Sequence, residues 1–114
     1  MQDTIQTLPH PYPAMNGATL AQVITAQYGT TDPEALAQRA GVQVHYARWF
    51  PATYGEFCAK TRTITLNQNA PVSLGAVLAH ELGHYFAQEA GYEGNTDVQE
   101  EIAKSFAEVL LQSL

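Results

Sequence analysis

The spacing of apolar residues changes twice along this chain, and the change limits the folds that it can adopt. Over Leu20–Tyr28, and again after Val72, apolar residues recur every three or four positions, which is the period of an amphipathic helix. Between these segments, Val42–Tyr46 and Thr63–Leu66 alternate apolar and polar residues, as half-buried strands do. The pattern therefore predicts an α+β fold with about four helices and a small antiparallel sheet of three strands.

Cap and stop residues bound the expected helices. A side-chain oxygen before a helix accepts a hydrogen bond from a free N–H of its first turn, and a glycine after it allows the left-handed turn that ends it. The chain places such residues in pairs: Asn16 and Gly29 around a first helix, Asp32 and Gly41 around a second. A third helix is expected from about residue 72 to 89, and a fourth opens at Thr96 with a capping-box sequence.

The third expected strand, Gly55–Ala59, lies between the other two in the sequence. We expect it to be the middle strand, with Lys60 and Thr61 at the polar tip of a hairpin. A small antiparallel sheet is the simplest arrangement of these three segments.

Length and composition fit one folded domain that follows a short arm. The chain has 114 residues, of which 46% are hydrophobic and 14% charged, and this is too apolar for a disordered chain. Pro9, Pro11 and Pro13 prevent a continuous helix, so residues 1–16 are expected to form a proline-rich arm. Residues 17–114 are expected to form the single domain.

Charge and composition exclude several classes of function. The net charge is −6 and no basic run is present, so direct nucleic-acid binding is not expected. No apolar stretch reaches the roughly 20 residues that span a bilayer, and the first residues lack the pattern of a signal peptide. We therefore expect a cytoplasmic protein without membrane contact. Cys58 is the only cysteine, so a metal site must use histidines and carboxylates.

The third expected helix contains an HExxH sequence. Residues four apart lie on one face of a helix, so His80 and His84 can direct both imidazoles at one metal ion. Glu81 is offset around the helix axis, which places it to accept a proton from a water on that ion. Imidazole suits Zn²⁺, and catalytic zinc keeps three protein ligands and an exchangeable water.

The alternative interpretation is two histidines and a glutamate on a solvated helix. The flanking residues argue against it, because the helix is apolar around much of its circumference: Val77, Leu78, Ala79, Leu82, Tyr85 and Phe86. A charge on such a helix needs a partner. The metal site is therefore the preferred interpretation.

A third metal ligand is expected from the last helix, where Glu100 and Glu101 are the main candidates. Glu100 shares a helix face with Ala103 and Ala107, small residues that can pack against the metal-binding helix, whereas Glu101 shares a face with charged and polar residues. We therefore choose Glu100, which completes the His₂Glu set of thermolysin-like zinc sites. His10 and His45 are the alternatives, and they are expected in the arm and on an exposed strand.

Two further polar residues are candidates for catalysis or substrate binding. Tyr85 follows Glu81 by one turn and would stabilise the oxyanion of a tetrahedral intermediate, although such a residue is more often a packed aromatic. Asn67 follows a strand and would bind the substrate backbone, although an asparagine there more often forms a turn.

Four ordered segments of the chain resemble the ImmA/IrrE metallopeptidases, a zincin group of the gluzincin type. They lie between about residues 32 and 111, and they are Asp32–Ala37 leading to Gly41 and Val42, Arg62–Asn67, Ala79–Tyr85, and Glu100–Ala107. The last is similar to the family's Glu-x-x-Ala-x-x-Phe-Ala helix, which again selects Glu100.

The resemblance implies a minimal zincin-like domain that is a zinc-dependent endopeptidase, with Mn²⁺ as the alternative metal. Its typical substrate is a helix-turn-helix repressor in bacteria, phages or mobile elements, and removal of the repressor switches on genes for stress response or element transfer. The Arg62–Leu66 strand, taken as the sheet edge above the cleft, would receive this substrate as an added strand. The alternative function is a metal-stabilised antirepressor that binds its partner without cutting it. Glu81 argues against that alternative, since binding alone needs no general base.

Overall fold

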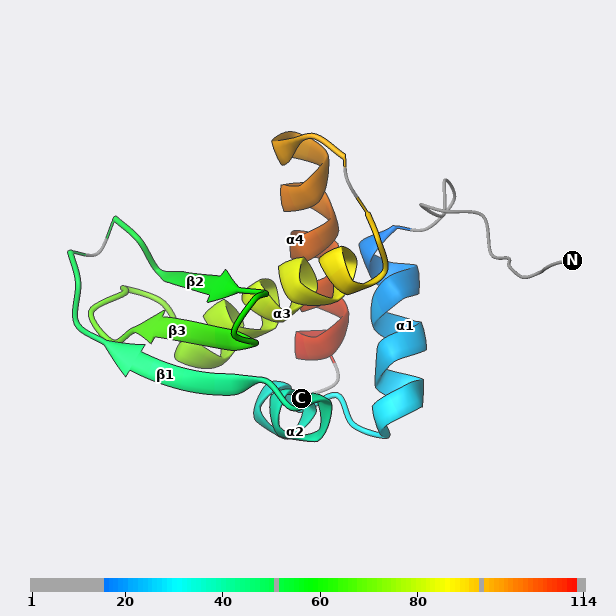
Figure 1. Cartoon of the computed structure of the whole chain (residues 1–114), viewed down its shortest axis with the longest axis horizontal. Helices are drawn as coiled ribbons and strands as arrows, with labels where there is room; N and C mark the ends of the chain where they lie inside the picture. Colours follow the sequence, from blue (N-terminus) through cyan, green and yellow to red (C-terminus); the bar gives the residue numbers. More distant parts are fainter. Residues whose placement is uncertain (1–15, 51, 93, 113–114) are drawn as a thin grey trace, which may run out of the picture.

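The computed structural model describes residues 16–50, 52–92 and 94–112, which form four helices and a three-stranded sheet (Figure 1). The predicted α+β fold with about four helices is therefore confirmed. The expected arm at residues 1–16 lies outside the described residues except for Asn16. In chain order the elements are α1 (Gly17–Tyr28), α2 (Pro33–Ala40), β1 (Gln43–Ala47), β2 (Gly55–Cys58), β3 (Thr63–Asn67), α3 (Leu74–Glu89) and α4 (Thr96–Gln112).

The first two helices begin and end at the predicted residues. The side chains of Asn16 and Asp32 accept hydrogen bonds from the first turns of α1 and α2, and Gly29 and Gly41 end these helices in the left-handed conformation. The last helix begins at Thr96 as predicted, but its capping residue lies one position earlier than expected. The side chain of Asn95, and not that of Thr96, accepts the hydrogen bond from the N–H of Val98, so the cap precedes the expected capping box.

The sheet is mixed, and the prediction of an antiparallel sheet was wrong. Its strand order is β1-β3-β2, with β1 parallel to β3 and β2 antiparallel to β3. The hairpin between the second and third strands forms as expected, but Gly55–Cys58 is an edge strand and not the middle one. The strand expected at Arg62–Leu66 lies in the centre as Thr63–Asn67, paired on both sides, so it cannot receive an added strand.

Asn67, at the end of β3, holds the connection that carries the chain from β1 on one edge of the sheet to β2 on the other. Its side chain is fully buried and binds the connection between β1 and β2, which crosses the end of β3. Its amide nitrogen donates to the carbonyls of Trp49, Phe50 and Thr53 at 3.3, 3.0 and 2.7 Å, and its carbonyl oxygen accepts from the N–H of Trp49 at 3.0 Å. One buried amide thus makes four hydrogen bonds to the backbone of this connection. The predicted turn role of Asn67 fits this position, and its side chain is not available to a substrate.

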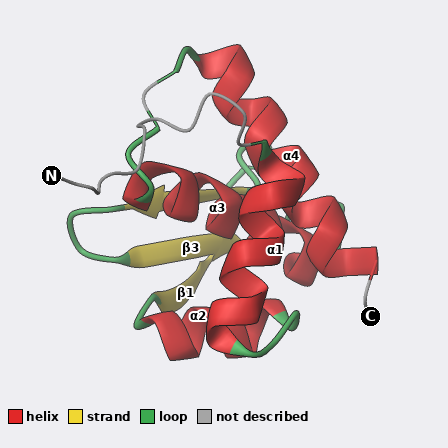
Figure 2. Ribbon diagram, turned by 90° about the vertical axis from the view of Figure 1, so that its right-hand side faces the viewer, coloured by secondary structure: helices red, strands yellow, loops and turns green. Residues whose placement is uncertain are grey.

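Helix α3 lies at the centre of the domain. It packs against β2 and β3 on one side and against α4, α1 and α2 on its other sides. Figure 1 shows the sheet at one end of the molecule and α1 beside α4 at the other, and Figure 2 shows the same layers turned by 90°. Ile64 and Leu66 of β3 are fully buried. No helix among the described residues combines the length and the apolarity needed to cross a membrane.

Replacing Asn67 with Ala is expected to lower the free energy of unfolding by about 3 kcal/mol, because four hydrogen bonds between a buried side chain and the connection are lost at once. Asn69→Ala is the matched control, since that exposed side chain donates one hydrogen bond to the Trp49 carbonyl, and its loss should cost less than about 1 kcal/mol. Urea denaturation followed by circular dichroism measures both. Equal losses would show that Asn67 does not hold the crossing connection.

Candidate metal centre

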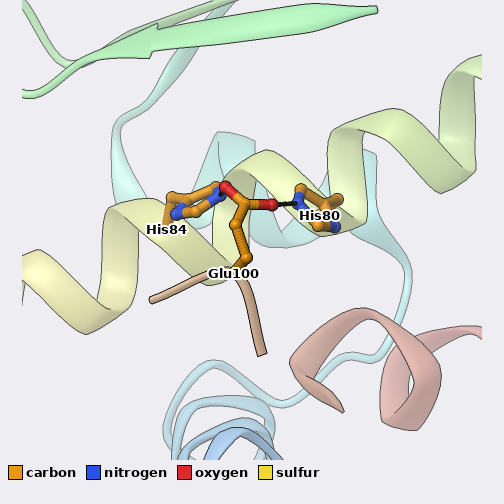
Figure 3. A group of neighbouring side chains, drawn as sticks. All are labelled: His80, His84 and Glu100. Carbon is orange, nitrogen blue, oxygen red and sulfur yellow. Dashed lines mark hydrogen bonds and ion pairs between the residues drawn. The ribbon is translucent and has the colours of Figure 1, made fainter. Parts of the chain in front are cut away.

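Three of the predicted site residues meet at the junction of α3 and α4. His80 and His84 lie one turn apart on α3, and Glu100 of α4 lies between their rings (Figure 3). The Nε2 atom of His80 is 3.1 Å from Oε1 of Glu100, and the Nε2 atom of His84 is 2.8 Å from Oε2. The three ligand atoms all lie within 4.8 Å of one another, and no other such group of three occurs within the described ranges.

The close approach of α4 to α3 brings Glu100 to the histidines. A Cβ atom at Gly83 would lie 2.8 Å from the Cα of Ala103 and 3.1 Å from the Cβ of Phe106. Real Cβ atoms do not approach other atoms this closely, so only glycine fits here. The side of α4 that contacts Gly83 is the small-residue face that the sequence indicated, and Glu100 lies on it one turn before Ala103.

Burial favours a neutral ring at His84. Burial lowers the pKa of His84, the nearby His80 lowers it further, and the Glu100 carboxylate opposes this. Phe57 of β2 stacks on the His84 ring, with 6.0 Å between ring centroids and an interplanar angle of 11°. A neutral imidazole offers the lone pair that a metal ion needs.

Glu81 lies beside the three donors but is not one of them. Its carboxyl group has a pKa raised to about 7, mainly by burial and further by the negative charges of Glu100 and Glu56. β2 passes close to this side chain, because a Cβ atom at Gly55 would lie 3.3 Å from the Cγ of Glu81. A metal cation at the centre would lower the pKa of Glu81 again, since a nearby positive charge favours the ionised carboxylate.

Two cavities open on either side of the centre along α3. One, of about 510 Å³, includes His80 and Glu81 in its wall, and the other, of about 550 Å³, includes His84 and Phe57. The carboxylate of Glu100 is also accessible, since its side chain is 56% exposed. Water and other ligands therefore have access to the group.

The donors fit a divalent metal ion. Zinc lies about 2.0 to 2.2 Å from nitrogen and oxygen ligands, so tetrahedral ligand atoms are about 3.3 Å apart; the separations here, 3.1 Å to Oε1 and 2.8 Å to Oε2, would have to widen slightly around an ion. Two imidazoles and one carboxylate leave a position open for water or substrate. This donor set also suits other divalent metals, so the geometry supports a metal ion without selecting zinc.

The alternative ligands lie elsewhere. Glu101 is exposed on the next position of α4 and joins no metal-binding group of the described residues. His45 is exposed on β1, where its Nε2 is 3.2 Å from the side-chain oxygen of Gln43. His10 lies outside the described residues.

Tyr85 lies in the hydrophobic core and not at the metal-binding group. Its side chain is 2% exposed, and the Arg62 guanidinium lies over its ring, 5.7 Å from the centroid. Arg62 in turn donates to the carbonyl of Ala40 at the end of α2, which fixes this side of α3 against α2. Tyr85 thus has the position of a packed aromatic, and an oxyanion-stabilising role would require the ring to leave the core.

Sequence reasoning missed Gly83 and Phe57. A lone glycine inside a helical pattern indicates a packing role, and this signal at Gly83 was available. The sequence places Phe57 in a strand and gives no sign of its contact with His84, because that contact joins segments that are distant in the sequence.

Comparison with known proteins gives no assignment, because no family model, curated protein or solved structure matches the chain. The resemblance to the ImmA/IrrE metallopeptidases therefore depends on the four sequence segments alone.

Protein purified without added metal is expected to contain close to one equivalent of zinc, and His84→Ala should lose it. Glu100→Ala should weaken zinc binding at least tenfold, because the only carboxylate of the group is removed. Glu101→Ala is the matched control and should leave zinc binding nearly unchanged. Elemental analysis and competition with a chelator measure these effects. Equal effects at the two glutamates would reject the assignment of Glu100.

Gly83→Ala is expected to weaken zinc binding and to lower stability by about 1 to 3 kcal/mol, because the added methyl group pushes α4 and Glu100 away from α3. Gly75→Ala on the same helix is the control. A Cβ atom there meets only the Ser73 hydroxyl at 3.5 Å, so this change should leave zinc binding unaltered. The same chelator competition, with urea denaturation, gives both readouts, and an unchanged zinc affinity in Gly83→Ala would separate the helix contact from the centre.

Proposed function

We propose that this chain is a zinc-dependent endopeptidase that cleaves a specific protein partner, a helix-turn-helix repressor, in the cytoplasm. One observation carries the proposal: a carboxylate outside the donor set, that of Glu81, opens with His80 onto a cavity at the metal centre. A centre used only to stabilise a fold needs no such group. The resemblance to ImmA/IrrE peptidases supports the same reaction and supplies the class of substrate.

The roles follow from the placement of the side chains. His80, His84 and Glu100 would hold the ion, and bound zinc supplies a Lewis acid that polarises a peptide carbonyl and makes water more acidic. Glu81 accepts the proton of the attacking water and then passes it to the leaving amine. The new C–O bond forms first, and the C–N bond breaks when the amine takes up the proton, so the products are a carboxylate and an amine.

The substrate is expected to bind along the outer edge of β2. This edge pairs with no other strand of the described residues, and Gly55 and Phe57 of the strand lie beside Glu81 and His84. An extended peptide added here forms main-chain hydrogen bonds next to the centre. The strand thus takes the place that the sequence had assigned to Arg62–Leu66.

The small domain favours a narrow range of substrates. Binding energy from a folded partner must position the scissile bond, because the described residues beside the centre offer only the edge of β2 and two open cavities. The net charge of −6 suits a basic partner such as a DNA-binding repressor, and salt should weaken the association.

Replacing Glu81 with Gln is expected to lower the rate of repressor cleavage at least a hundredfold, while zinc content and repressor binding stay unchanged, because only the proton acceptor is lost. Glu89→Gln, an exposed change on the same helix, is the control and should retain full activity. Candidate repressors from the same genome are incubated with each zinc-loaded protein, and fragments are identified by mass spectrometry.

Casein serves as a general substrate in the same assay and should be cut poorly. Efficient casein digestion would reject the narrow specificity. Repressor binding without cleavage, in the presence of zinc or manganese, would reject the peptidase and favour the antirepressor.

A further inference from the structure

The connection between β1 and β2 carries aromatic side chains at the surface. Phe50 is 88% exposed, and Trp49 beside it is half-buried. Both line an open hollow of about 920 Å³, together with Arg48, Glu56 and Asn69. Figure 1 shows this connection at the end of the molecule farthest from α1. Covering an aromatic ring that lies in water is favourable, so this surface gains free energy when a partner binds it.

The backbone of these exposed residues is held in place. The fully buried side chain of Asn67 donates to the carbonyls of Trp49 and Phe50 and accepts from the N–H of Trp49. The side-chain amide of Asn69 donates to the Trp49 carbonyl as well, at 3.0 Å. A buried polar side chain thus holds a segment that stays at the surface. A segment with a fixed backbone loses little conformational freedom when a partner binds it.

Arg48 gives the hollow a positive charge on an acidic protein. The chain has five Lys and Arg residues against eleven Asp and Glu residues. Arg39 and Arg62 donate to backbone carbonyls at the ends of helices. Among the described residues, Arg48 makes one contact of 3.5 Å with the side-chain oxygen of Asn69 and no ion pair with a carboxylate. Its guanidinium therefore has donors left for a carboxylate of a partner.

The hollow is continuous with the cavity beside the metal centre. Ala52 and Thr53 line both this hollow and the cavity that contains Glu81. The Asn67 amide also donates to the Thr53 carbonyl, so one side chain holds both places. A folded protein that presents a segment to the centre therefore brings its neighbouring surface over Phe50.

We propose that Arg48, Trp49 and Phe50 form an anchoring surface for the protein substrate, away from the reacting bond. The part of the substrate that fits it is a folded surface with an apolar hollow for the Phe50 ring and a carboxylate beside that hollow for Arg48. Aromatic and arginine side chains are the types that contribute most to protein interfaces. The inference rests on the proposed function and deepens it, because it names the surface by which the chain selects its partner.

Binding of purified repressors tests the anchoring surface. Helix-turn-helix repressors from the same genome are produced singly, and each is titrated into the zinc-loaded full chain carrying Glu81→Gln, with calorimetry as the readout. Adding Phe50→Ala should weaken the binding of the repressor that binds at least tenfold, because an anchoring side chain is lost. Val23→Ala is the matched control, since Val23 is 50% exposed on α1, and it should bind like the parent. Equal affinities for the parent and Phe50→Ala overturn the inference.

The sign of a charge effect tests Arg48. Arg48→Gln and Gln22→Glu, on the exposed side of α1, each change the net charge by −1. A more acidic chain attracts a basic repressor at least as strongly, so Gln22→Glu should leave binding unchanged or strengthen it. Arg48→Gln should weaken binding at least threefold, because a carboxylate of the repressor loses its partner. Stronger binding by both variants shows that Arg48 meets no carboxylate and overturns the inference.

Cleavage kinetics separate the anchoring surface from the reacting centre. With the bound repressor as substrate, Phe50→Ala in the otherwise unmodified chain should raise KM at least tenfold and leave kcat within about twofold, because Phe50 does not touch the reacting atoms. A ten-residue peptide that spans the cut should be cleaved equally by both proteins. An unchanged KM for the intact repressor, or slower cleavage of the peptide, overturns the inference and leaves the peptidase function standing.

The remaining outcomes distinguish the inference from the proposed function. A repressor that binds through Phe50 and is not cut rejects the peptidase, while the anchoring surface stands. If none of the repressors binds the unmodified chain, both are rejected. Sedimentation of the chain alone covers the other occupant: a dimer that Phe50→Ala dissociates would show that a second copy covers this surface, and would overturn the inference.

Discussion

The close contact between α3 and α4 at Gly83 is the constraint on which the centre depends. Two histidines on one helix turn supply two donors, and a third must come from another element at a fixed separation. Ala103 packs directly on Gly83, and this places Glu100, one turn earlier on α4, between the two imidazoles. A glycine inside a helix costs about 1 kcal/mol relative to alanine. The packing of α4 and the geometry of the donors offset that cost.

The sequence predicts those residues of the metal centre whose positions follow from the regular repeat of a helix. The spacing of His80 and His84 fixes a shared face, and the small residues that follow Glu100 indicate which side of α4 packs inward. Both arguments need only the geometry of a regular helix, which varies little from protein to protein. The structure brings these three residues together, and it places Glu101 in solvent.

The sheet shows where such reasoning stops. A period of two identifies a strand and its buried face, but it carries no information about which strands are neighbours. Here a side chain at the end of β3 determines how the chain crosses, because Asn67 binds the connection that passes over that strand. The contacts of the aromatic residues are likewise not predictable from their positions in the sequence. Tyr85 is next to His84 in the sequence yet faces the core, while the ring that stacks on His84 comes from β2, a strand separate from that helix.

The free edge of β2 has a consequence for the behaviour of the protein in solution. An unpaired strand edge can pair with the same edge of another molecule, which here would cover the metal-binding group of both copies at once. Two features oppose such self-pairing. The strand has only four residues, which limits the number of hydrogen bonds between copies, and Glu56 brings a negative charge to the edge of each copy. If the strand binds a substrate as proposed, a peptide without an acidic residue at this position avoids the repulsion that a second copy of the chain would meet.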